Sequence, residues 1–63
     1  MKKLEYKFEQ LQLLAQVFEN NAKIISEIKY KEKSKTFKLL EYDKCVYIII
    51  YEDNHCAGIL EIE

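Results

Sequence analysis

The side chains best suited to metal binding or catalysis lie in the C-terminal third of the chain. Cys45, His55 and Cys56 are metal-ligand types, and Asp53 precedes the second cysteine closely. A structural zinc site needs converging ligands, and its cysteine pairs are usually about two to four residues apart. Here the cysteines are eleven positions apart (56 − 45). The spacing disfavours a metal site within one chain, so we expect no metal ion and no cofactor.

The segment from Asp53 to Cys56 also has the residue types of a catalytic nucleophile and its general base. His55 and Cys56 are adjacent, however, and adjacent residues in a strand point to opposite faces. No third group that would orient the histidine is evident. The single glycine, Gly58, also excludes a glycine-rich phosphate loop. We therefore expect no catalytic residues, and a protein that is not an enzyme.

Lysines recur in the middle of the chain and suggest a second kind of chemistry. Lys29, Lys31 and Lys38, together with nearby tyrosines, could hold the phosphates and bases of a single-stranded nucleic acid. Lysines also solubilise a hairpin tip and protect an edge strand. The net charge is −1 and arginine is absent, whereas nucleic-acid-binding proteins usually have a positive excess. Nucleic-acid binding is therefore the alternative hypothesis.

The overall composition indicates one small domain spanning residues 1–63. The chain is 49% hydrophobic and 13% aromatic, which is unlike a disordered segment. No apolar run has the length of a secretory signal or a membrane span. We expect a cytoplasmic protein with reduced thiols and no membrane contact. All ten strongly basic residues are lysines and none is arginine. This usage is typical of AT-rich genomes, such as those of some bacteria and phages.

A helical period fills the first third of the chain. Leu4, Phe8, Leu11, Ala15 and Phe18 recur at spacings of three and four, which predicts an amphipathic helix over about 3–20. The asparagine pair at 20–21 is a plausible end, because asparagine tolerates the left-handed conformation found after helices. A continuation of the helix to about residue 28 is the alternative.

Strand-like alternation follows over about 22–63. Residues 36–42, 45–51 and 56–62 are rich in β-branched and aromatic side chains and are separated by short polar segments. Such short connections demand antiparallel neighbours. The sequence predicts an α+β fold in which one N-terminal helix packs on a four-stranded antiparallel meander.

The simplest strand register sorts these side chains onto two faces. We paired Lys31 with Thr36, Tyr42 with Cys45 and Tyr51 with Cys56. One face is then almost wholly apolar and is the expected bed for the helix. Its residues are Ile24, Ile28, Tyr30, Phe37, Leu39, Val46, Ile48, Ile50, Ala57 and Ile59. The other is apolar and tyrosine-rich on its last three strands. We expect that face, the outer side of the helix, or both to form an interface. The predicted interface residues are Leu40, Tyr42, Tyr47, Ile49, Tyr51, Leu60, Leu13 and Val17.

A contiguous apolar patch and the absence of a catalytic pattern favour one functional class. Tyrosine is a typical interface residue, because it buries area while its hydroxyl stays hydrated. Symmetric homodimers are the commonest oligomers. We therefore expect a small interaction or regulatory protein that acts as a homodimer, with another protein as the alternative partner. The competing interpretation is that the tyrosines only cover one side of the sheet, or that a one-residue slip alters the faces.

Overall fold

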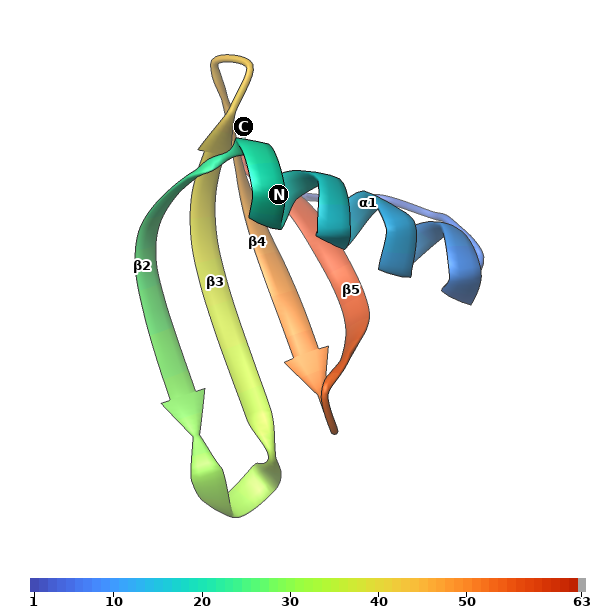
Figure 1. Cartoon of the computed structure of the whole chain (residues 1–63), viewed down its shortest axis with the longest axis vertical. Coiled ribbons are helices and arrows are strands. Elements are labelled where there is room, and N and C mark those ends of the chain that lie inside the picture. The colour runs from blue at the N-terminus through green and yellow to red at the C-terminus, as the bar shows by residue number, and fades with distance from the viewer. Residues whose placement is uncertain (63) are drawn as a thin grey trace.

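The computed structural model describes residues 1–62 and has an α+β fold, in which one α-helix lies across a five-stranded antiparallel sheet (Figure 1). The strand order is β1-β5-β4-β3-β2. The elements are β1 (Lys2–Lys3), α1 (Phe8–Asn21), β2 (Lys23–Tyr30), a 3-10 turn (Lys31–Lys33), β3 (Lys35–Tyr42), β4 (Cys45–Glu52) and β5 (His55–Ile62). The predicted helix and four-stranded meander are confirmed, and β1 is an additional strand that we did not predict.

The start of the helix differs from the prediction. Lys2 and Lys3 pair with β5, and the N–H of Leu4 donates to the carbonyl of Ile59 at 2.9 Å. These backbone bonds hold the first residues in an extended conformation, so the predicted start near residue 3 is wrong. The N–H of Lys7 instead donates to the side-chain oxygen of Gln10 at 3.1 Å, which caps the first turn. At the other end the helix stops at Asn21, as preferred from the asparagine pair.

Two tight hairpin turns set most of the sheet register. Asp43 and Lys44, and likewise Asp53 and Asn54, have φ angles of 51° and 67°. Positive φ at both central residues is typical of the two-residue turns whose twist matches that of the flanking strands. The pairings Tyr42↔Cys45 and Tyr51↔Cys56 follow, as predicted.

Three departures from the simple register occur in β2 and β5. Thr36 pairs with Lys29 instead of Lys31, a slip of two residues that leaves the faces of residues 26–30 unchanged. An irregularity between Ile24 and Ser26 then places Ile24 opposite Leu40, on the other face from Ile28. In β5 an irregularity follows the second turn, so that Ile49 pairs with Ile59 and Ile48 with Leu60. An extra residue in one strand exchanges the faces of every side chain beyond it. Leu60 and Ile62 therefore leave the face that we predicted, and Ile59 joins it.

The hydrophobic core lies between α1 and the tyrosine-bearing face of the sheet. Phe18 packs against the rings of Tyr42 and Tyr47, with centroids 5.2 and 4.7 Å away. Tyr42, Tyr47 and Tyr51 are half-buried around the core. The buried hydrophobic side chains are Leu11, Ala15, Phe18, Leu40, Ile49, Cys56 and Ile59.

The helix thus covers the opposite face from the one we predicted. Leu40 and Ile49 are fully buried, so the prediction that they lie on an open interface is wrong. The physical reason is β1. The antiparallel pairings make β1 and β2 parallel to one another, and α1 connects them across the width of the sheet. Such connections have a strong handedness preference, which decides the face that a helix occupies.

Candidate functional site

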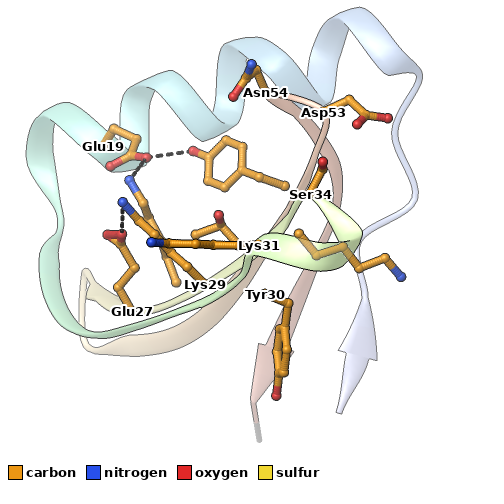
Figure 2. Close-up of a pocket in the computed structure, with 12 residues that line it drawn as sticks. Glu19, Glu27, Lys29, Tyr30, Lys31, Ser34, Asp53 and Asn54 are labelled. Carbon is orange, nitrogen blue, oxygen red and sulfur yellow. Dashed lines mark hydrogen bonds and ion pairs between the residues drawn. The ribbon is translucent and has the colours of Figure 1, made fainter.

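A polar hollow lies between the C-terminal half of α1 and the β2–β3 hairpin (Figure 2). Its volume is about 540 Å³, and it forms where α1 stops short of covering the helix side of β2 and β3. Acidic, basic and hydroxyl-bearing side chains surround it. The lining residues are Glu19, Glu27, Lys29, Tyr30, Lys31, Ser34, Lys35, Thr36, Lys38, Tyr51, Asp53 and Asn54.

One carboxylate organises the inner wall of this hollow. Oε2 of Glu19 accepts hydrogen bonds from Nζ of Lys38 at 2.5 Å and from the hydroxyl of Tyr51 at 2.7 Å. The Lys38 ammonium also lies 5.4 Å from the centroid of the Tyr51 ring. Because three elements contribute, the contacts join α1 to β3 and β4. Their first role is to hold the helix on the sheet.

The ionisation state of the Glu19 carboxylate agrees with a structural role. Partial burial raises the pKa of Glu19, but the hydrogen bonds from Lys38 and Tyr51 outweigh it, so the pKa lies below its ordinary value of 4.5. Burial and the neighbouring carboxylate raise the pKa of Tyr51. Glu19 is therefore ionised and Tyr51 neutral near neutral pH. A charged acid held by two donors is poorly suited to general acid or base catalysis.

The lysines of the nucleic-acid hypothesis lie around the same hollow but do not form a free cationic surface. Lys38 bonds to Glu19, and Lys29 lies 3.4 Å from Glu27. Lys31 is exposed at the mouth of the hollow. The carboxylates among the lining residues offset most of the positive charge. This arrangement gives little electrostatic attraction for a phosphate backbone.

The cysteines and the histidine do not converge. Cys45 and Cys56 are free thiols at opposite ends of the β4–β5 hairpin. The ring of His55 packs on Phe8, with centroids 5.3 Å apart. Within residues 1–62, no group of three His, Cys, Asp or Glu side chains is placed to hold a metal ion. Burial raises the pKa of the Cys56 thiol, which disfavours the thiolate that nucleophilic chemistry requires.

The second candidate site is the sheet face that α1 leaves bare, which we call the open face. Cross-strand pairing arranges it in rows: Ile28, Phe37, Ile50 and Gly58 form one row, and Ser26, Leu39, Ile48 and Leu60 form the next. Val46 and Ile62 extend it at one end, and Tyr30 at the other, where its ring points away from the helix (Figure 2). No described element packs over these side chains. The open face is a contiguous apolar surface of the kind that marks binding sites.

A shallow apolar depression on the open face lies over β2 and β3. Its volume is about 350 Å³. The Tyr30 and Phe37 rings meet edge to face at one end, with centroids 5.6 Å apart. Ser26 supplies the small side chain that leaves the space. The lining residues are Ser26, Ile28, Tyr30, Phe37, Leu39 and Ile48.

The predicted interface residues separate into three groups. Leu40, Tyr42, Tyr47, Ile49 and Tyr51 pack beneath α1 and belong to the core or its margin. Leu60 lies on the open face. Leu13 and Val17 are 64% and 43% exposed on the outer side of α1, where the prediction placed them.

The open-face residues that sequence reasoning assigned to the helix bed include the two most exposed large apolar side chains of the described sheet. Ile28 is 52% exposed and Tyr30 is 51% exposed, although both are large and apolar. The alternation pattern grouped them correctly with Phe37, Leu39, Ile48 and Ile50. The strand at Lys2–Lys3 had no comparable signal, because two adjacent lysines show no alternation and the strand forms by pairing with β5.

Comparison with known proteins gives no relative for this chain. No protein-family model, curated protein or solved structure matches it. Within the described residues, no helix has the length and apolar character needed to cross a membrane.

Proposed function

We propose that this chain is a small, non-enzymatic interaction protein that works as a homodimer in the cytoplasm and binds through its open face. The observation that carries the proposal is a contiguous apolar sheet face that no described element covers. Water-exposed apolar area of this extent is unfavourable unless a partner removes it from solvent. The two free thiols agree with a reducing compartment.

The size of the open face fits a second copy of the chain. Strands β2 to β5 each contain eight residues. At spacings of about 4.8 Å between strands and 3.3 Å between residues, the face measures roughly 19 by 26 Å. Two such faces would bury on the order of 1,000 Å², which reaches the lower range of specific interfaces.

Pairing through a sheet edge is less favourable than pairing through the open face. The side chain of Gln12 occupies the edge of β5, where it accepts from the N–H of Cys56 at 2.8 Å and donates to its carbonyl at 2.7 Å. Together with β1, it satisfies backbone groups that another strand would need. The opposite edge, β2, has a register irregularity between Ile24 and Ser26. Such bulges, and the lysines of β2, are devices that discourage edge-to-edge association.

The test compares a charge on the open face with a charge on the outer side of the helix. Ile48→Lys places an ammonium group at the centre of the open face, and Leu13→Lys places one on the 64% exposed helix position. Each variant is first checked for native circular dichroism. Size-exclusion chromatography with light scattering then gives the mass at several concentrations.

The proposal predicts that Ile48→Lys is a monomer near 7.6 kDa while Leu13→Lys dimerises like the wild type. If Leu13→Lys dissociates and Ile48→Lys does not, the outer side of α1 is the interface and the open face is not.

A further inference from the structure

Large and small side chains exchange places between β2 and β5, which we call the outer strands of the open face because only the two-residue β1 lies beyond β5. In one row, Ile28 stands on β2 and Gly58 on β5. In the next row the order is reversed, with Ser26 on β2 and Leu60 on β5. Each outer strand therefore presents one projection and one niche.

The projections and niches are visible in the local surroundings. Ile28 is 52% exposed and stands out from the face. A Cβ added at Gly58 would meet no atom within 4 Å, so this position is a true gap. Ser26 lines the apolar depression of about 350 Å³ on β2 and β3. An uncovered sheet whose gaps match its own projections can pack against a copy of itself without voids.

At one end of the open face, the charged side chains are also complementary to those of a second copy. Lys35 on β3 pairs with Glu52 on β4, and their charged groups are 3.0 Å apart. Their side chains are 38% and 40% exposed, so both can accept a further partner.

We propose that a second copy of this chain stacks on the open face about a two-fold axis that runs along the strands, between β3 and β4. This inference rests on the proposed function and gives it a geometry. The axis places β2 over β5 of the partner and β3 over β4 of the partner. Ile28 then meets the partner's Gly58, Leu60 enters the depression beside the partner's Ser26, and Lys35 faces the partner's Glu52. The assembly has four layers, with a helix outside each sheet.

Another two-fold axis, running across the strands, also brings large residues onto small ones. It would, however, set the depression on β2 and β3 against the same depression of the partner, because each strand then lies over its own copy. Two facing depressions leave a cavity, and unfilled volume lowers the stability of an interface. The axis along the strands sets the depression against β4 and β5 instead, where the side chains of Ile48 and Leu60 can fill it.

The test is a size-exchange experiment on the full chain. Gly58→Val fills the niche, and its Cβ has open space in the single chain. Association should weaken by about tenfold or more, measured as the dimer dissociation constant by sedimentation. Adding Ile28→Ala should restore it to within about threefold of the wild type. Positions 28 and 58 are three strands apart, about 14 Å, so rescue must arise across the interface.

The control is Leu60→Ala combined with Gly58→Val. If Leu60→Ala restores the dimerisation of Gly58→Val and Ile28→Ala does not, the two-fold axis does not run along the strands. That result would support the axis across the strands. If circular dichroism shows that Gly58→Val folds poorly, the other niche gives the same test. Ser26→Leu should then weaken the dimer, and adding Leu60→Ala should restore it. If neither niche-filling variant weakens a dimer that Ile48→Lys dissociates, the docking geometry is wrong and the proposed function stands. If Ile48→Lys also has no effect, both are wrong.

Discussion

The two faces of the sheet are built from the same strands, but α1 covers one face and no described element covers the other. On the helix side, Ile49 is fully buried, tyrosine rings surround the core, and the Tyr51 hydroxyl donates to Glu19. On the open face, the adjacent Ile48 is half-buried only by its strand neighbours. The face with more aliphatic residues is thus the one without a helix. Apolar content alone does not tell which face of a sheet belongs to the monomer core and which to a partner.

The largest expected effect comes from placing one charge on each face at adjacent positions. Ile49→Lys buries an ammonium group without a partner and should remove more than about 4 kcal/mol of stability. Ile48→Lys should cost the monomer about 1 kcal/mol, because its ammonium group reaches water. Urea unfolding followed by circular dichroism, at a concentration where the dimer dissociates, measures both. Equal losses would mean that the open face is as buried as the core.

The second prediction concerns the polar contacts that seat the helix. Gln12→Ala leaves the N–H and carbonyl of Cys56 without their side-chain partners, so we expect a loss of about 1–3 kcal/mol of unfolding free energy. Gln16→Ala is the matched control, because Gln16 is exposed on the same helix and should change stability by less than about 0.5 kcal/mol. If both variants lose the same amount, the Gln12 contacts do not contribute to the difference between the faces.

A third prediction uses acid to weaken the helix side selectively. The pKa of Glu19 is lower in the folded chain than its ordinary value of 4.5. Its contribution is therefore complete above pH 4.5 and is lost as the pH falls through the folded-state value. Because Glu19 is partly exposed, we expect Glu19→Gln to cost only about 0.5–1 kcal/mol at pH 7. The variant should lose less stability than the wild type on acidification, measured by urea unfolding from pH 6 to the acid limit. Glu9→Gln controls for the removed charge, and a parallel acid profile for Glu19→Gln and wild type would contradict the assignment.

The smallest expected effect is a charge exchange at the end of the open face. Lys35→Glu and Glu52→Lys each break the pair within the chain and place like charges across the proposed interface. Either variant alone should dimerise about threefold more weakly than the wild type. Mixing the two restores opposite charges between subunits only, so a heterodimer should predominate in native mass spectrometry. A statistical mixture of the three dimers would show that these side chains do not meet across the interface.

Local patterns predicted the parts of the fold that depend on neighbours in sequence. The helical stripe placed Leu11, Ala15 and Phe18 toward the core, and the short polar segments gave the two hairpin turns and their closing pairs. These features depend on side-chain periodicity and on backbone conformations at two or three adjacent residues, which the sequence states directly.

Long-range pairing determined the rest. The strand Lys2–Lys3 forms only because β5 offers an edge nearly sixty residues later (61 − 2 = 59), and two lysines carry no strand period by themselves. The irregularity at the start of β5 moves Leu60 to the open face, although the turn before it is regular. Both depend on the assembled sheet. They explain why the side-chain groupings in β3 and β4 were predicted correctly while the face covered by the helix was not.

Sedimentation equilibrium of the wild-type chain over a wide concentration range is the most direct test of whether the open face is a subunit interface. We predict a mass of about twice 7.6 kDa that falls toward the monomer value only on strong dilution. A mass that stays at 7.6 kDa up to millimolar concentration would contradict it, and the open face would then not bind a second copy of this chain.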